Sequence, residues 1–468
     1  MRPNVLLIVL DSVRAANTSL HGYHRETTPF LSEFSKEATV YREARTNGRW
    51  SVPAHASLFT GYAASEHGLY SPTSKLKPEQ TIFHELGEAG YRTGLFSSNS
   101  FVTGEIDTGL HLDFEKVVGD LEPFFPEGID PLNYNGGVGS FLRDAMCHKH
   151  PVQSVINGIL TKLGWDYPYI IPTSLTAGTS ASRPLDSYYI NQFEQWKENG
   201  TGPWAACVNL MDAHVPYLPA SNPWASFRAK QRHLQWGLDW EILSKERFDL
   251  LPEFTDLYDG AIQQTDSHLQ RIITNLKRSG EFEDTLIVIA GDHGEGFGEQ
   301  SPIRGIPVIQ HLYGFHECIL HVPLITKHPG QTESETIDEL AALQGFPQLV
   351  RDTVFENQQT DMRKSEIYVS GHLTDNNIQS WQQHTDSDPR FRGHVQLKYE
   401  QNEHNQIVKY IGWKSRAIEM NGQKVRPISR EELERDFDSL SDMEMILSND
   451  EQEISESTTR KLEDLGYL

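Results

Sequence analysis

Four polar side chains that can bind a metal or move a proton follow apolar runs of the sequence. These side chains are Asp11, His214, Asp292 and His293. The run Val5–Leu10 directly precedes the first of them, Leu286–Ala290 precedes the adjacent aspartate and histidine, and the weaker run Ala205–Leu210 precedes the other histidine. Continuous apolar runs of this kind are typical of strands that are covered on both faces of a sheet. Since ligands of open α/β sheets bind at the carboxyl ends of the strands, we expect these side chains to meet at one edge.

Metal-assisted hydrolysis is the chemistry that these residue types favour. Two carboxylates at neighbouring strand ends, Asp11 and Asp292, would repel each other unless a divalent cation lay between them. Such a cation would polarise the oxygens of an ester and lower the pKa of a nucleophile. His214 can protonate a leaving oxygen at neutral pH, because the unperturbed pKa of imidazole is about 6.5. The competing interpretations are a helix cap for Asp292 and a buried structural imidazole for His214.

A candidate nucleophile lies in the segment Gly48–Gly61, which reads GRWSVPAHASLFTG. Pro53 follows Ser51 closely, and proline is favoured in the first turn of a helix because its missing N–H is not needed there. A hydroxyl at a helix N-terminus, or its modified form, lies beside free backbone N–H groups that favour a bound oxyanion. The alternative is that Ser51 only caps the helix.

The composition is that of an acidic globular protein. The 468 residues include 65 acidic and 41 basic side chains, which give a formal net charge of −24. This charge argues against nucleic acid or an anionic membrane surface as the main partner. It fits either a halophilic protein that stays soluble in high salt or an ordinary acidic cytosolic protein.

The N-terminal sequence and the cysteines indicate a cytoplasmic protein. The run Val5–Leu10 is too short to span a membrane, and no signal-peptide cleavage site follows it. Cys147, Cys207 and Cys318 form neither a disulfide framework nor a metal-binding pair. We therefore expect a cytoplasmic chain with no membrane span.

The order of strand-like and helical stretches predicts an α/β fold with a largely parallel sheet. Helical spacing covers 82–89, 257–279 and 337–355, while short strand-like runs at 367–369, 395–398 and 406–411 follow. Residues 121–190 are rich in Pro, Gly and aromatic residues and predict an insertion, which either covers the active site or is a surface excursion. We expect a catalytic domain at 1–355 and a smaller α+β subdomain at 356–468.

The segment at Ser51 resembles the sulfatase signature of the alkaline phosphatase superfamily, C/S-x-P-x-R-x-S-L-x-T-G. Further landmarks of this family follow in the family's order along the chain. They are Leu6–Asp11, Arg14, Gly90–Gly94, Asp212, His214, Pro216, Tyr217, Asp284–Leu286, Asp292–Glu295, Glu317, His321–Ile325 and Leu465–Leu468. The resemblance implies a large mixed, mostly parallel sheet with helices on both faces, and an enzyme that hydrolyses sulfate esters.

The resemblance also implies one divalent metal ion. Asp11, Asp292 and His293 match the metal ligands of the family, and Ser51 completes the site. The family pattern makes Ca²⁺ the first expectation. Ser12 stands where many calcium-binding members have a second aspartate, and this loss of charge leaves Mg²⁺, Mn²⁺ and Zn²⁺ open.

The catalytic roles follow from the same match. Ser51 corresponds to the cysteine or serine that the family converts to formylglycine, whose hydrate attacks sulfur. His214 corresponds to the residue that contacts the ester and protonates the leaving oxygen. His311 corresponds to the lysine or histidine that holds the sulfate, a place for which His316 competes. His55 stands in the place of the signature arginine, which holds the formylglycine.

Two departures from the family pattern bear on the substrate. His55 replaces the arginine that helps formylglycine maturation, and Ser98–Ser100 replaces the K-W-H of many sulfatases. Three hypotheses result: a sulfate ester hydrolase, a phosphate ester hydrolase or phosphoryl transferase that uses unmodified Ser51, and an inactive binding member of the fold. The expected substrate is a small-molecule or carbohydrate ester. The sequence assigns neither a leaving group nor an oligomeric state.

Overall fold

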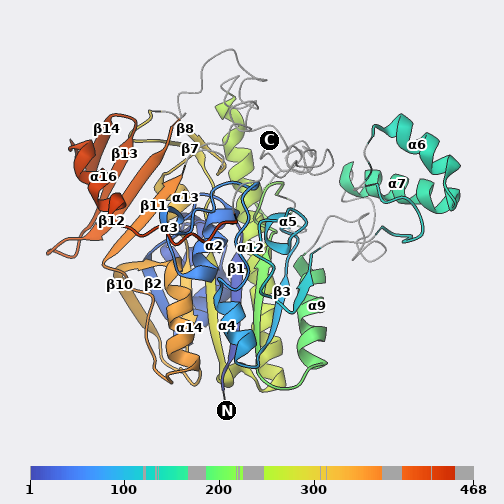
Figure 1. Cartoon of the computed structure of the whole chain (residues 1–468), viewed down its shortest axis with the longest axis horizontal. Coiled ribbons are helices and arrows are strands. Elements are labelled where there is room, and N and C mark those ends of the chain that lie inside the picture. The colour runs from blue at the N-terminus through green and yellow to red at the C-terminus, as the bar shows by residue number, and fades with distance from the viewer. Residues whose placement is uncertain are drawn as a thin grey trace.

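The protein is built around one large β-sheet, as a computed structural model shows (Figure 1). The structure describes residues 2–119, 123–131, 134, 136–166, 186–217, 219, 222–224, 247–305, 307–311, 314–371, 393–422 and 424–447. The sheet has eight strands in the order β10-β2-β9-β6-β1-β5-β3-β4. In that order the strands are Glu335–Ala342, Thr39–Arg45, Leu324–Lys327, Thr285–Gly291, Asn4–Leu10, Trp204–Leu210, Arg92–Phe96 and Lys116–Val118.

The strand directions confirm the predicted mixed, mostly parallel sheet. Strand β9 runs antiparallel to its neighbours β2 and β6, and the other neighbouring pairs run parallel. The central strand β1 aligns its last residue, Leu10, with Leu210 of β5 and Gly291 of β6. The three strands therefore end side by side, and the residues that follow them start from one edge of the sheet.

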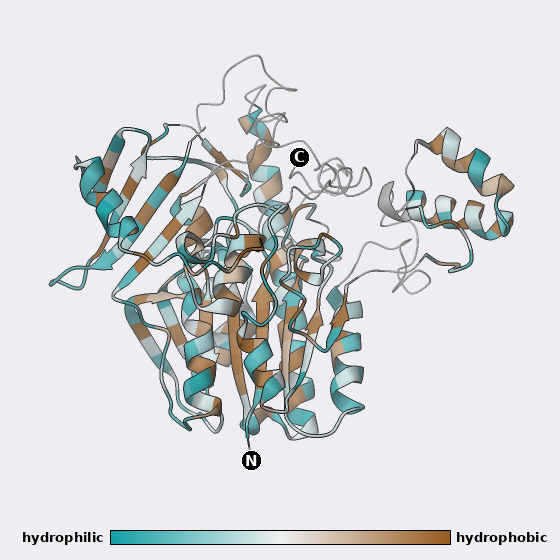
Figure 2. Cartoon of the chain, viewed as in Figure 1, coloured by the Kyte–Doolittle hydropathy of each residue, from teal (hydrophilic) through white to brown (hydrophobic). Residues whose placement is uncertain are grey.

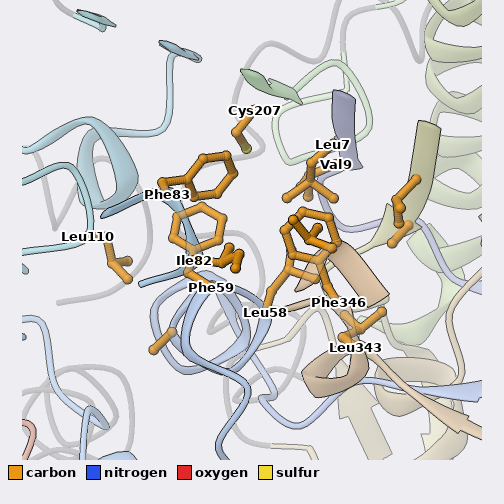
Figure 3. Packing of buried hydrophobic residues seen from close by; sticks show 14 of the residues in the cluster. Leu7, Val9, Leu58, Phe59, Ile82, Phe83, Leu110, Cys207, Leu343 and Phe346 are labelled. Atoms are coloured by element: carbon orange, nitrogen blue, oxygen red, sulfur yellow. The ribbon is translucent and has the colours of Figure 1, made fainter. Parts of the chain in front are cut away.

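Each face of the sheet has its own hydrophobic core, and β1 contributes to both. Val5, Leu7 and Val9 belong to one core, and Leu6, Ile8 and Leu10 belong to the other. Figure 3 shows Leu7 and Val9 in the first core with Phe59 and Phe346. Successive side chains of a strand point to opposite faces, so an unbroken apolar run is required where both faces are covered. Burial of each such side chain contributes roughly 1.5–3 kcal/mol.

Helices cover both faces of the sheet, as predicted. The helices α2 (Ser51–Thr60), α4 (Ile82–Glu88) and α14 (Phe346–Val354) contribute to the first core. The helices α1 (Pro29–Phe34), α9 (Asp186–Glu198) and α12 (Leu251–Ser279) contribute to the second. Figure 2 shows apolar strands between helices whose outer faces are polar. Shorter helices are α3 (Ala64–His67), α5 (Ser100–Thr103) and α13 (Glu317–Leu320), and short 3₁₀ turns lie at Ala15–Asn17, Ser19–His21, Ser35–Glu37, Phe248–Leu250, Phe282–Asp284 and Leu343–Gly345.

The predicted helix at 337–355 is wrong in its first third. Strand β10, Glu335–Ala342, occupies that part and pairs with β2, and helix α14 begins only at Phe346. Glu, Leu and Ala in this stretch favour a helix locally, but pairing with β2 at the edge of the sheet and the burial of Leu340 outweigh this helix propensity.

A second sheet forms the C-terminal subdomain, which agrees with the expected α+β unit. Its antiparallel strands are β11 (Glu366–Gly371), β12 (Val395–Gln401), β13 (Ile407–Trp413), β14 (Arg416–Asn421) and β15 (Lys424–Pro427), and helix α16 (Arg430–Asp438) packs on them. A small hairpin joins β7 (Phe297–Gln300) to β8 (Pro307–Ile309). The terminal landmark Leu465–Leu468 lies outside the described residues.

The described part of the predicted insertion contains the helices α6 (Val138–Cys147) and α7 (Pro151–Asp166). They pack on each other where Phe141 approaches Gly158, and they lie to one side of the main sheet (Figure 1). Much of the remaining insertion, 167–185, is outside the described residues. Among the described helices, none is long and apolar enough to cross a membrane.

Candidate active site

The ends of β1 and β6 bring two carboxylates together, as the strand register requires. Asp11 and Asp292 follow the aligned residues Leu10 and Gly291 and are fully buried. Ser12 links them, because its hydroxyl donates to Asp11 Oδ1 at 3.0 Å and its backbone N–H donates to Asp292 Oδ1 at 3.0 Å. Ser12 has a φ of 63°, a left-handed conformation that is uncommon for a residue with a side chain. A sharp turn directly after β1 thus fixes both carboxylates.

His293 completes a cluster of possible metal ligands with these carboxylates. Its Nε2 atom lies 3.4 Å from Asp292 Oδ2 and 3.9 Å from Asp11 Oδ1, and all three side chains are buried. One potential ligand atom from each residue lies within 4.8 Å of those from the others. The His293 Nδ1 donates to the carbonyl of Gly294 at 3.1 Å, so Nε2 is the nitrogen that carries the lone pair.

The donor set fits a divalent cation. Asp292 Oδ2 is buried and accepts no hydrogen bond in the described structure, although a buried carboxylate oxygen without a partner is costly. Burial, and then the charge of Asp11, raise the pKa of Asp292 well above its usual value. Burial also opposes ionisation of Asp11, but the imidazoles of His214, His293 and His55 outweigh it and lower that pKa. A cation between the carboxylates would remove both penalties.

Ser51 lies at the first residue of α2 and faces this cluster. Its Oγ accepts a hydrogen bond of 3.1 Å from Asn99 Nδ2 and lies 3.4 Å from His293 Nε2. Trp50 occupies the N-cap position, so the side chain of Ser51 does not serve as the helix cap. The hydroxyl is thereby left for chemistry at the sheet edge.

His55 lies one helical turn after Ser51 and is completely buried. Its Nδ1 donates to the Ser51 carbonyl at 2.9 Å and lies 3.7 Å from Asp292 Oδ2. Burial lowers the pKa of His55 to about 4, so the imidazole is neutral at neutral pH. A neutral ring therefore stands where the family pattern has a guanidinium.

His214 and His311 extend the site beyond the metal-ligand cluster. The ring centres of His214 and His311 are 5.2 Å apart, and those of His311 and His293 are 4.4 Å apart. The His214 Nδ1 donates to the carbonyl of Val215 at 2.6 Å, which fixes the orientation of the ring. His316 instead accepts a hydrogen bond from Cys318 N and caps helix α13.

Glu295 is a site residue whose role sequence reasoning missed. It is buried, contacts His311 Nδ1, and accepts a hydrogen bond of 2.7 Å from Tyr217. Burial raises the pKa of Glu295 to about 7, while burial and the neighbouring imidazoles of His293 and His214 lower the pKa of His311 far below its usual value. The carboxyl sets the orientation of the imidazole. The position of Glu295 directly after Asp292-His293-Gly294 is the sequence feature that could have predicted its role.

Two asparagines were also missed, and each contacts Asp11. Asn99 Nδ2 donates to Asp11 Oδ2 at 3.0 Å as well as to Ser51, while its Oδ1 caps helix α5. Asn209 Nδ2 donates to the same Asp11 oxygen at 3.3 Å from the end of β5. Asn99 lies within Ser98–Ser100, the segment that replaces the K-W-H of many sulfatases. Asn99 is a neutral donor that joins Ser51, the candidate nucleophile, to Asp11, a candidate metal ligand.

Gly48 allows helix α2 to begin close to the site. A Cβ atom at Gly48 would lie 2.4 Å from the backbone nitrogen of Ala54. We expect Gly48→Ala to displace the first turn of α2, lowering the free energy of unfolding by about 1–3 kcal/mol and reducing activity. Thermal unfolding and an ester hydrolysis assay measure these effects.

The matched control is Gly87→Ala. Gly87 lies in helix α4, and a Cβ there would meet no atom within 4 Å. Alanine is the better helix former, so the control should keep or raise the melting temperature. Equal melting temperatures and activities of the two variants would contradict the close approach at Gly48.

Comparisons with known proteins agree with this fold. The family model described as Sulfatase matches residues 3–351. The multifunctional alkaline phosphatase superfamily protein PehA of Trinickia caryophylli is 32% identical over 389 residues, which cover 73% of each chain. The extracellular sulfatase SULF-1 homolog of Drosophila melanogaster is 25% identical over 360 residues, which cover 72% of this chain and only 28% of that protein.

A solved structure shows the same architecture. The phosphonate monoester hydrolase of Agrobacterium radiobacter superposes with a TM-score of 0.55 over 90% of this chain and 89% of that chain. The sequences are 17% identical, so this likeness establishes the fold alone.

Proposed function

This chain belongs to the sulfatase family, and from that membership we propose that it is a metal-dependent hydrolase of sulfate esters. The observation that carries the proposal is the position of Ser51 Oγ, at the N-terminus of α2 and 3.4 Å from His293 Nε2 in the cluster with Asp11 and Asp292. The nucleophile is Ser51 or the formylglycine made from it. In the proposed division of the chain, 1–355 carries the chemistry and 356–468 forms the accessory subdomain.

The proposed reaction uses the side chains in distinct roles. The Ser51 hydroxyl, or a hydroxyl of the formylglycine hydrate, gives its proton to water and forms a bond to sulfur, while the bond between sulfur and the leaving oxygen breaks. His214 gives its Nε2 proton to that leaving oxygen. Cleavage of the resulting sulfate ester of the enzyme then releases sulfate and restores the nucleophile. Asn99 orients the nucleophile by donating to Ser51 Oγ at 3.1 Å. His311, oriented by Glu295, contacts the sulfate oxygens.

Asp11, Asp292 and His293 are the proposed ligands of one divalent ion, with Ser51 as the fourth. The bound ion supplies Lewis-acid polarisation of the ester oxygens and a lowered pKa for the nucleophile. Two carboxylates favour Ca²⁺, Mg²⁺ or Mn²⁺, whereas the imidazole also suits Zn²⁺. Ca²⁺ remains the first choice from the family resemblance.

A phosphate or phosphonate ester is the second candidate substrate. The neutral His55 and Asn99 support it, because the family pattern has an arginine at one position and K-W-H at the other. An unmodified Ser51 hydroxyl can act as the nucleophile of phosphoryl transfer. The relation to PehA, which is described as multifunctional, is compatible with either ester. For the leaving group we propose a carbohydrate or another small alcohol.

Mass spectrometry of the tryptic peptide Trp50–Lys75 from natively expressed protein tests the choice. Conversion of Ser51 to formylglycine removes the mass of two hydrogen atoms. We expect this loss, together with metal-dependent cleavage of 4-nitrophenyl sulfate. An intact Ser51 with cleavage of a phosphonate or phosphate ester but not of the sulfate would replace the first proposal with the second.

A further inference from the structure

A buried carboxylate behind the site holds the turn that carries His214. Asp186 is the first residue of α9 and is fully buried. Its Oδ1 accepts from the backbone N–H of Met211 at 2.8 Å, and its Oδ2 accepts from that of Asp212 at 3.0 Å. Both oxygens of one carboxylate are therefore used by two consecutive residues that directly follow strand β5.

The same turn is held from its other side by α12. Asp212 Oδ2 accepts from Gln264 Nε2 at 2.7 Å and lies 3.0 Å from His268 Nε2. Within the turn, His214 N–H donates to the carbonyl of Met211 at 2.9 Å. The backbone of His214 is thus tied to a residue that Asp186 binds directly, and the turn lies between two helices of the second core.

A second buried aspartate, Asp266, binds backbone N–H groups in the same way but away from the site. Asp266 accepts from the backbone N–H groups of Phe30 at 2.7 Å and Leu31 at 2.9 Å, and it is likewise buried. That carboxylate joins α12 to α1, on the same face of the sheet. Both aspartates are buried and each accepts from two consecutive backbone N–H groups, but only the backbone bound by Asp186 leads to a residue of the site.

We propose that Asp186 is a positioning residue for His214, which it holds in place for protonation of the leaving oxygen. This inference rests on the proposed function. The proton travels from His214 Nε2 to the oxygen released when its bond to sulfur or phosphorus breaks. Asp186 takes no part in that transfer. It keeps the turn from moving, and a displacement of about 1 Å can cost a catalytic group on the order of 10²-fold in rate.

The test compares Asp186→Asn with Asp266→Asn. Each substitution replaces one accepting oxygen with an amide that faces a backbone N–H, so each should lower the melting temperature. Both variants are assayed with 4-nitrophenyl sulfate, whose leaving phenolate needs little protonation, and with an alkyl sulfate, whose leaving alkoxide needs a proton. If the wild-type protein cleaves phosphonate esters instead, the same aryl and alkyl pair is made in that class.

We expect Asp186→Asn to lower kcat for the alkyl ester by roughly 10²-fold, with a change of less than about tenfold for the aryl ester, as loss of general acid catalysis requires. KM should change little. Asp266→Asn should affect both esters alike. In addition, Asp186→Asn should have little further effect on alkyl ester cleavage in a His214→Ala background, since the two changes remove the same step.

Each outcome bears on a different statement. If Asp186→Asn affects both esters as Asp266→Asn does, Asp186 is merely structural and the inference is overturned. If Asp186→Asn does not fold, Asp186→Glu, which keeps a carboxyl group but shifts its position, should show the same selective loss to a smaller extent, and equal losses on both esters overturn the inference. A wild-type protein that cleaves neither ester class overturns the proposed function itself, and the inference with it.

Discussion

Replacing Ser51 with alanine is expected to lower kcat for the cleaved ester by at least about 10³-fold, because a nucleophile cannot be replaced by binding interactions alone. The hydroxyl is the group that both Asn99 and His293 approach. Steady-state kinetics measure the loss. The fold should remain intact, because alanine suits a helix and the N-cap of α2 is Trp50.

Ser57→Ala is the matched control for this change. Ser57 lies in the same helix, is equally buried, and its hydroxyl lies 3.1 Å from the imidazole of His67. Its replacement should cost roughly 1 kcal/mol of stability through the lost hydrogen bond, with kcat nearly unchanged. A Ser51→Ala protein that retains full metal-dependent hydrolysis would remove Ser51 from the mechanism, and with it both ester hypotheses.

Replacing Asp292 with asparagine is expected to have opposite effects on the metal-free and metal-loaded protein. Without metal, Asp292 and Asp11 are buried together, and burial with the charge of Asp11 raises the pKa of Asp292. This penalty on the ionised form vanishes in a neutral amide, so the chelated variant should be more stable than the chelated wild type. With metal, the variant loses an anionic ligand and should lose most of its affinity and activity.

Thermal unfolding with and without chelator measures this inversion. Wild-type protein should gain melting temperature when the ion is restored, because binding to the folded state alone stabilises it. The Asp292→Asn variant should have a higher melting temperature than the wild type in the presence of chelator. Its melting temperature should rise little when the ion is added at the same concentration. Asp266→Asn, which alters a buried carboxylate of α12 outside the cluster, should keep the full metal-dependent gain. A gain of the same size in Asp292→Asn would show that Asp292 is not a ligand.

The sequence predicted the framework of the site well, and for a definite reason. The apolar runs before Asp11 and Asp292 predicted strands covered on both faces, and β1 and β6 are such strands. The register of β1 with β6 then places the two aspartates at one edge. This step needed only the rule that parallel strands end together. The predicted helix at 337–355 was wrong in its first third because β10 gains its hydrogen bonds from β2, a strand far away in the sequence.

The sequence by itself determined the fold class, the family and the set of polar residues at the strand ends, because these are encoded in local periodicity and in short motifs. Only the tertiary structure decided that Asn99 bonds to Ser51, that Glu295 orients His311 and that Asp186 holds the turn before His214. Each of these contacts joins segments whose separation is set by how strands and helices pack. Asparagine, glutamate and aspartate occur commonly on protein surfaces, so their residue types alone do not predict such roles. Burial in the folded chain makes the roles specific, since a buried polar group must find a partner.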